Sequence, residues 1–186
     1  MQGGLEWARS ATVADLARVR VLWERAAREL DERRGGRRLV LASPRPPELD
    51  AGEPTRGSGP GARDRHGPAG PDDLPAVTDT ERVLVVGGID DVVLGFAEAV
   101  VERGAPVPVA VLRAAYVEEG ARGVGIGEAM VELVTEWAGA QGCAGIDAYA
   151  LPGSRSAKAF FEDQGFVTRL LTMYRPLSGG GRDDGR

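Results

Sequence analysis

A glycine-rich loop follows an extended apolar run and opens an amphipathic helix, and this order constrains the fold more than any other feature of the chain. Residues 107–117 form the extended run, and residues 118–127 form the loop, which reads Glu-Glu-Gly-Ala-Arg-Gly-Val-Gly-Ile-Gly. Apolar residues then recur at helical spacing and predict one buried helix face. That face carries Ile126, Met130, Leu133, Val134, Trp137 and Ala138. A strand that leads through a short loop into a helix is typical of α/β architecture.

The other periodic segments predict a mixed sheet with helices. A helical stripe runs from Leu16 to Leu30 and ends before Gly35. Two β-rich runs flank a Gly/Asp turn, which favours an antiparallel hairpin. The further expected elements are strands over residues 5–9, 82–86, 92–101, 144–150 and 166–177, the hairpin turn over 87–91, helix ends at Gly139 and Gly142, and a helix over 156–164. Hairpins combined with crossover helices indicate an α/β fold of the α+β kind.

Three short patterns predict helix boundaries. Thr12 with Asp15 resembles a helix start that places an acidic residue in the first turn. Ser154, after Pro152-Gly153, is a candidate helix N-cap. Gly165 is the expected C-terminal stop of the last helix.

A change in composition at Ser43 predicts an insert. Residues 43–75 hold 8 Pro and 6 Gly in 33 residues and no aromatic residue. Such a segment buries too little apolar surface to offset its ordering entropy. We therefore expect one domain over residues 5–177, with a disordered insert over 43–75 and a disordered tail over 178–186.

The reactive side chains are few, which excludes several chemistries. The chain has one His, one Cys and one Lys. A zinc site of Cys and His ligands needs more of both, so no metal is expected. A lone Cys143 forms no internal disulfide. The single His66 lies inside the predicted insert, where a solvated linker residue is the favoured interpretation.

Charge and hydropathy exclude two classes of partner, nucleic acids and membranes. The net charge is −5 and no block of consecutive basic residues occurs, so dedicated nucleic-acid binding is not expected. No apolar run reaches the ~18 residues of a membrane helix, and no signal-peptide pattern is present. The expected compartment is the cytoplasm.

The glycine-rich loop predicts an anion site. Alternating glycines let main chain approach a ligand closely, and amides at a helix N-terminus point toward an anion. Arg122 adds a cation at the same place. A dinucleotide fingerprint fails, because Glu128 or Met130 stands where its third glycine is required. The loop therefore predicts a phosphate or pyrophosphate site built mostly from backbone.

The sequence resembles the GNAT superfamily of acyl-CoA-dependent N-acyltransferases. Arg122-x-x-Gly125-x-Gly127 is similar to the family motif after its fourth strand. The run Phe-Phe-Glu-Asp-Gln-Gly-Phe over residues 160–166 is similar to the end of the family's fourth helix, and residues 8–16 are similar to its opening. The resemblance covers residues 6–177 apart from the insert. It implies a mixed, mostly antiparallel sheet whose fourth and fifth strands splay into a cleft flanked by helices.

The resemblance also implies a reaction and a binding site. The family transfers an acyl group from acyl-CoA, here acetyl-CoA, to an amine that attacks directly, without an enzyme nucleophile. Pantetheine pairs with the fourth strand and pyrophosphate sits on the loop amides, with a strand amide near Val117 as oxyanion donor. Carried over by motif, the CoA-binding residues are Tyr116, Val117, Arg122, Gly123, Val124, Gly125, Ile126, Gly127, Glu128, Ser154 and Phe161.

This sequence departs from the family at the general acid. Phe161 stands where many members carry a tyrosine near the CoA sulfur, and it has no proton to give. Thiolate departure is then unassisted, water-assisted, or served by Tyr149 or Tyr174. Ser154 replaces the Asn that many members carry at the start of the same helix. The same departure leaves a second hypothesis open, a non-catalytic regulatory module that binds acyl-CoA.

Several carboxylates are candidate bases for the amine. Glu98, Glu118, Glu119 and Asp147 lie on or after the predicted strands, and Glu98 and Glu118 are favoured. The expected acceptor is a small-molecule or peptide amine, and the expected state is a monomer or homodimer. A third hypothesis assigns the insert to partner recruitment.

Overall fold

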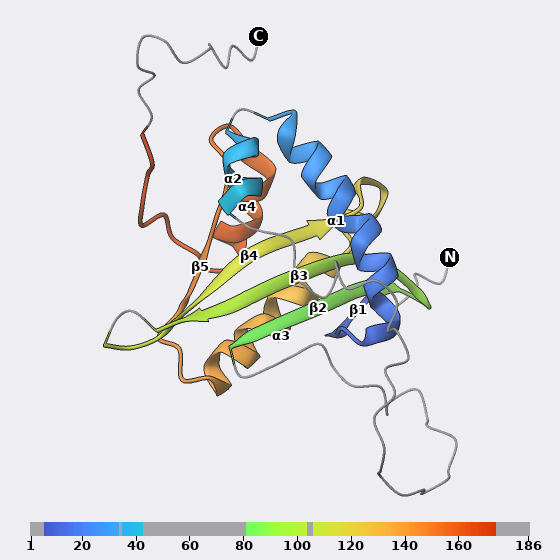
Figure 1. Ribbon diagram of the computed structural model, residues 1–186, viewed down its shortest axis with the longest axis horizontal. Helices are drawn as coiled ribbons and strands as arrows, with labels where there is room; N and C mark the ends of the chain where they lie inside the picture. Colours follow the sequence, from blue (N-terminus) through green and yellow to red (C-terminus); the bar gives the residue numbers. More distant parts are fainter. Residues whose placement is uncertain (1–5, 34, 43–80, 104–105, 174–186) are drawn as a thin grey trace, which may run out of the picture.

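The computed structural model describes residues 6–33, 35–42, 81–103 and 106–173 (Figure 1). The elements in chain order are β1 (Glu6–Ser10), a 3-10 turn (Val13–Asp15), α1 (Leu16–Asp31), α2 (Gly36–Ala42), β2 (Arg82–Ile89), β3 (Val92–Glu102), β4 (Val109–Val117), a second 3-10 turn (Glu119–Ala121), α3 (Ile126–Ala140), β5 (Ile146–Ala148) and α4 (Arg155–Asp163). The predicted insert over 43–75 with His66, the residue Tyr174, and the predicted tail over 178–186 all lie outside the described residues.

The strands form one sheet in the order β1-β2-β3-β4-β5. The first four strands pair antiparallel, and β4 pairs parallel with β5. The antiparallel neighbours follow one another along the chain, whereas α3 provides the crossover that a parallel pair requires. The expected mixed, mostly antiparallel sheet is confirmed.

Helices cover both faces of the sheet, because side chains of β2 alternate between them. Val83 and Val85 pack in a cluster with Met130 of α3, and Leu84 and Val86 pack in a second cluster with Leu22 of α1. Figure 1 shows α1 crossing one face of the sheet and α3 lying on the other. The sheet is therefore the middle layer between two apolar cores.

The hairpin turn is shorter than the sequence predicts. Gly87 and Gly88 belong to β2, and the turn is Asp90-Asp91 alone, because Ile89 pairs with Val92. A Cβ on Gly87 would lie 2.8 Å from Cγ2 of Ile126, so glycine here lets α3 approach the sheet. The turn itself uses a left-handed Asp90, with φ of 50°.

Other boundaries also differ from expectation. The glycine pair ends α1 as expected, but a second helix, α2, starts at Gly36 and was not predicted. Gly139 lies inside α3, and the left-handed Gly142 follows its end. Gly139 does not end α3, because one glycine inside a helix costs only ~1 kcal/mol, which packing can offset.

The segment after α4 is not a strand over its described part. Residues 166–173 pair with no other strand of the described chain. Apart from Phe166, which packs against the core, the apolar side chains of this segment are strongly exposed, with Leu170 at 82% and Met173 at 90%. β-rich composition alone does not make a strand, because a strand requires a partner edge, and β5 beside it is only three residues long.

Candidate active site

β4 diverges from β5 halfway along its length. β5 pairs only with Ala110, Val111 and Leu112. The register of β3 with β4 shifts at the next residue, since Glu98 pairs with Ala114 and Ala99 with Leu112. Arg113 is thus the extra residue of a bulge, and a bulge bends its strand. The splay of the fourth and fifth strands is confirmed, and its origin is this bulge.

A cleft of about 550 Å³ lies along the open half of β4. One wall is β4 from Leu112 to Val117, and the other comes from the chain after β5 and from α4. Trp23 and Phe96, whose rings lie 5.4 Å apart, contribute an apolar inner wall, with Leu39 and Val40 of α2 beside them. The cleft is thus largely apolar, and it is bordered by the part of β4 that no strand of the described residues pairs on the β5 side.

The glycine-rich loop carries the chain from β4 to α3 at the mouth of this cleft. Gly123 and Gly125 both adopt left-handed conformations, with φ of 79° and 99°, which explains the glycines there. α3 begins at Ile126, and its first intrahelical bond runs from the Ala129 amide to the Gly125 carbonyl. The amides of the first helical turn have no partner within a helix and suit an anion. Gly123, Gly127 and Glu128 line the cleft.

The opposite wall holds three residues singled out in the sequence. Phe161 lines the cleft and packs between Phe160 and Phe166, with ring centroids 5.3 and 5.2 Å away. Ser154 is the N-cap residue of α4, but its hydroxyl makes no capping bond and instead accepts from Arg33 at 3.3 Å. Tyr149 lines the cleft and is 52% exposed.

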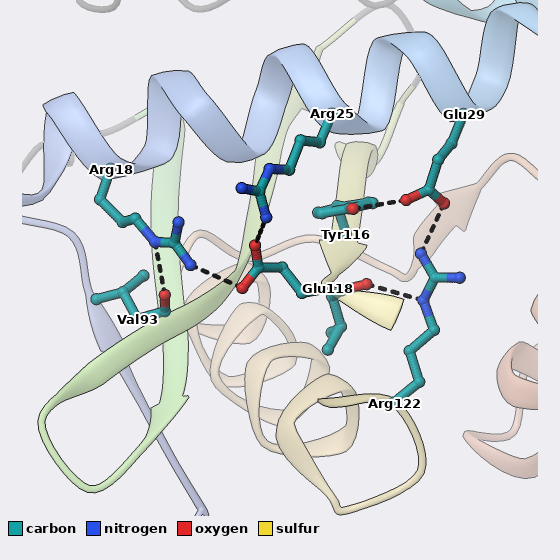
Figure 2. Close-up of polar contacts among 8 residues, drawn as sticks. Arg18, Arg25, Glu29, Val93, Tyr116, Glu118 and Arg122 are labelled. Atoms are coloured by element: carbon teal, nitrogen blue, oxygen red, sulfur yellow. Dashed lines mark hydrogen bonds and ion pairs between the residues drawn. The ribbon is translucent and has the colours of Figure 1, made fainter. Parts of the chain in front are cut away.

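Glu118 is held by α1 (Figure 2). Its two carboxylate oxygens bind Arg18, at 2.7 Å, and Arg25. Arg18 also donates to the Val93 carbonyl at 2.8 Å. The side chain of Glu118 is only 16% exposed and lines a second cavity, of about 690 Å³, between α1 and the end of β4. These contacts tie α1 to the strand ends below it.

A second polar cluster joins Glu29, Tyr116 and Arg122 (Figure 2). The Tyr116 hydroxyl donates to Oε1 of Glu29 at 2.6 Å, and Nη2 of Arg122 donates to Oε2 at 2.7 Å. Nε of Arg122 donates to the Val117 carbonyl at 2.8 Å. Glu29, Tyr116 and Ala121 are the residues that line both cavities.

The cluster shifts two protonation equilibria in opposite directions. Burial alone raises the pKa of Glu29, but the hydrogen bonds from Tyr116 and Arg122 outweigh it and hold that pKa below its ordinary value. Burial, together with the hydrogen bond to the Glu29 carboxylate, raises the pKa of Tyr116 to about 12. Tyr116 is therefore a hydrogen-bond donor locked in its neutral form.

The remaining carboxylates predicted from sequence lie in different surroundings. Glu98 is only 3% exposed and lies 3.4 Å from Nε of Arg82, and it does not line either cavity. Asp147 faces Arg169 at 3.6 Å, and Glu119 lines the second cavity. Eight of the eleven predicted CoA residues line this cleft, whereas Val124 lines the second cavity and Gly125 and Ile126 line neither. Glu98 and Glu118 are not on the wall of the cleft.

Sequence reasoning missed Glu29. Arg18, Arg25 and Glu29 are spaced by seven and four residues, which places them on one side of α1. That spacing was available in the sequence, but it does not show which strand the charged side faces. Among the described residues, no group of three or more His, Cys, Asp or Glu could hold a metal ion. No described helix has the length and apolar character to cross a membrane.

Known structures share this fold. An aminoglycoside N-acetyltransferase, AAC(6')-Iy, in complex with CoA has a TM-score of 0.60 at 19% identity, with 94% of this chain and 97% of that chain covered. A mutant of the BH1408 protein from Bacillus halodurans has a TM-score of 0.61 at 21% identity, covering 91% and 98%. An aminoglycoside acetyltransferase from an uncultured soil metagenomic sample, HMB0005, has a TM-score of 0.59 at 14% identity, covering 94% and 99%.

Sequence comparison decides the family. No curated protein sequence matches the chain. The family model described as Acetyltransferase (GNAT) family matches residues 56–166, more than half of the chain, and this match includes the glycine-rich loop and the Gly165-Phe166 pair. The resemblance inferred from the sequence motifs is confirmed. The chain belongs to the acetyltransferase (GNAT) family and, by that membership, to the acyl-CoA-dependent N-acyltransferases.

Proposed function

We propose that this protein transfers an acetyl group from acetyl-CoA to a primary amine, which attacks the acetyl carbon directly. The observation that carries the proposal is the cleft of about 550 Å³ beside β4, with the N-terminus of α3 at its mouth. The residues fit CoA in two ways. Among the described strands, none pairs with the half of β4 beyond Leu112 on the β5 side, and the first turn of α3 offers amides to a diphosphate.

Each part of the site has a distinct role in this proposal. Main chain of Tyr116 and Val117 pairs with pantetheine, and amides from residues 122–128 hold the diphosphate. Acetyl-CoA supplies the activated acetyl thioester, and a β4 amide near Val117 stabilises charge on its carbonyl oxygen. Phe161 and Ser154 border the pantetheine path. Because Phe161 carries no proton, water or Tyr149, which lines the cleft, protonates the departing thiolate.

The base for the amine acts at a distance. Glu98 and Glu118, the favoured candidates, do not line the cleft between β4 and α4. A proton that either carboxylate takes from the amine therefore travels through water. The acceptor is a small-molecule amine in this proposal, consistent with the aminoglycoside acetyltransferases among the structural neighbours. The protein acts as a monomer or homodimer in the cytoplasm, as one domain over residues 5–177.

A thiol-release assay tests the function. Purified protein is mixed with acetyl-CoA and a panel of polyamines, aminoglycosides and peptide amines, and free CoA thiol is measured. We expect release that depends on one class of amine, with acetylated product by mass spectrometry. Absence of acceptor-dependent release across the panel would contradict the enzymatic proposal.

A matched pair of variants tests the diphosphate site. Val124 lies in the loop between two left-handed glycines and is 47% exposed, so a polar side chain there costs little stability. We expect Val124→Glu to weaken CoA binding by about tenfold through like-charge repulsion, an effect that shrinks with added salt. The neutral Val124→Gln variant should bind CoA as the wild type does. Equal affinities for the two variants by isothermal titration calorimetry would argue against a diphosphate at this loop.

Phe161 supports a second candidate function, a regulatory module that binds acyl-CoA without turnover. This phenyl ring lines the cleft where many family members carry a tyrosine acid. Tight CoA binding combined with no acetyl transfer to any amine would favour this candidate. Phe161→Tyr would then be the informative variant, because gain of turnover would show that only the acid is missing.

A further inference from the structure

Arg122 makes three contacts with the protein itself (Figure 2). Its Nε donates to the Val117 carbonyl at 2.8 Å, and its Nη2 donates to Glu29 at 2.7 Å. Its guanidinium carbon lies 5.5 Å from the centre of the Tyr116 ring. The Arg122 side chain is therefore directed toward α1 and β4. The backbone of its loop, with Gly123 and Gly125, leads in contrast to the N-terminus of α3.

The contacts use the shape of arginine, not its charge alone. The planar guanidinium of Arg122 uses two separate N–H donors, one for a main-chain carbonyl and one for a carboxylate. A lysine ammonium is a compact charge on a flexible stem and does not reproduce that geometry. The Glu29 carboxylate is in turn fixed from the other side by the Tyr116 hydroxyl, at 2.6 Å.

Arg122 binds the carbonyl of the Val117–Glu118 peptide, which lies at the end of β4. β4 beyond Leu112 has lost its neighbour β5, so its end is held by β3 and by side chains. The Glu118 amide donates to the Leu94 carbonyl at 2.9 Å, and the Val117 carbonyl of the same peptide accepts from Arg122. Both polar groups of this peptide are thereby fixed, one by the sheet and one by Arg122.

We propose that Arg122 and Glu29 are positioning residues that fix the Val117–Glu118 peptide at the end of β4, and that the diphosphate of CoA is held without the Arg122 charge. This inference rests on the proposed function, because the fixed peptide borders the main chain assigned to pantetheine and the thioester. It adds Glu29 to the residues that act in the reaction. It also gives Arg122 a role that differs from the one its motif suggests.

Four variants test the proposal: Arg122→Lys, Arg122→Gln, Glu29→Gln, and the double variant Glu29→Gln/Arg122→Gln. If geometry matters, Arg122→Lys should lower kcat as much as Arg122→Gln does, by about 10- to 100-fold, because small displacements of a reacting group cost that much. Glu29→Gln should act in the same direction, and the double variant should be no worse than Arg122→Gln, because both substitutions remove one shared unit.

Binding separates positioning from phosphate recognition. The affinities of each variant for CoA and for pantetheine, which has no phosphate, are measured side by side. A positioning role changes both affinities by the same factor, so their ratio stays at the wild-type value. A phosphate ligand behaves differently: Arg122→Gln weakens CoA but not pantetheine, Arg122→Lys stays near wild type, and Glu29→Gln leaves CoA binding equal or tighter. That second pattern would overturn the proposal.

A readout in the ligand-free protein keeps the test independent of the proposed function. Urea unfolding of the wild type, Glu29→Gln, Arg122→Gln and the double variant gives a double-mutant cycle, and coupling between Glu29 and Arg122 is expected. Strictly additive effects would overturn the clamp even if the enzyme is active. If the wild type binds no CoA, the proposed function fails, while the cycle still reports on the clamp.

Arg28→Gln is the matched control. It removes an arginine charge from the same helix, but Arg28 donates to the Glu24 carbonyl within α1. This variant should keep the wild-type ratio of CoA to pantetheine affinity and the wild-type kcat. A loss of kcat as large as that of Arg122→Gln would show that general charge on α1, not the clamp, sets the rate, and would also overturn the proposal.

Discussion

The two halves of β4 are built from similar residues but have different roles. Ala110 to Leu112 lie between β3 and β5, and all three residues are buried. Beyond the bulge at Arg113, β3 is the one strand of the described part of the chain that still pairs with β4, and the other edge of β4 borders the cleft. One half is core and the other is a site, although both are short apolar sequences.

Charged side chains from α1 replace the missing strand in the second half. Glu118 binds Arg18 and Arg25, and Arg122 bridges Glu29 and the Val117 carbonyl. These contacts come from α1 and from the loop after β4, instead of from a strand paired beside β4. A neighbouring strand would give more stability but would fill the cleft. A strand end whose edge is open to a ligand is therefore held by side-chain contacts instead of by a second neighbouring strand.

The largest expected effect is on protein stability and comes from a substitution in the buried half of β4. Val111 is only 4% exposed and does not line either cavity. Val111→Ala should destabilise the protein by about 2–3 kcal/mol, through lost apolar burial and the space left behind. Urea unfolding measures the loss, and CoA affinity of the folded protein should be unchanged. A large loss of affinity without loss of stability would contradict the division of β4 into two halves.

An intermediate effect is expected where α1 holds Glu118. Glu118→Gln keeps the shape but removes the charge that pairs with Arg18 and Arg25. We expect about 1 kcal/mol of destabilisation, since both arginines are partly exposed and solvent screens the pairs. The pH dependence of kcat then separates two roles. A supporting residue lowers kcat at every pH, whereas removal of the catalytic base would abolish the fall in rate on the acidic side.

The last prediction concerns the phenol of Tyr116 and a change in stability that is confined to alkaline pH. Its pKa is raised to about 12 in the folded protein, against about 10 in an unfolded chain. Between these values the unfolded state binds fewer protons than the folded one, so the free energy of unfolding falls as pH rises. This contribution is complete below about pH 10 and lost through about pH 12. Tyr116→Phe should lack this alkaline fall, as urea unfolding across that range would show. Parallel curves for both proteins would contradict the hydrogen bond to Glu29.

Local chemistry explains which elements the sequence predicted well. Thr12 and Asp15 do start the first helix, since the Thr12 amide donates to the Asp15 carboxylate at 2.8 Å. Gly165 does end α4, with φ of 81°. Both depend on groups a few residues apart, so sequence alone carries the information. The hairpin turn was misplaced because Gly87 and Gly88 leave room for Ile126 of α3 and for Trp7 of β1, which both lie far from them along the chain.

The sequence by itself determined the family, the order of most strands and helices, and the glycine-rich loop before α3, because each follows from periodicity or from residues close together in the chain. Only the tertiary structure decided where β4 leaves β5, how α1 supports its free end, and that Glu29 joins Tyr116 and Arg122. Glu29 and Arg122 are 93 positions apart in the chain, yet Nη2 of Arg122 lies 2.7 Å from Oε2 of Glu29. Contacts over such separations depend on how α1 crosses the sheet, which no local pattern encodes.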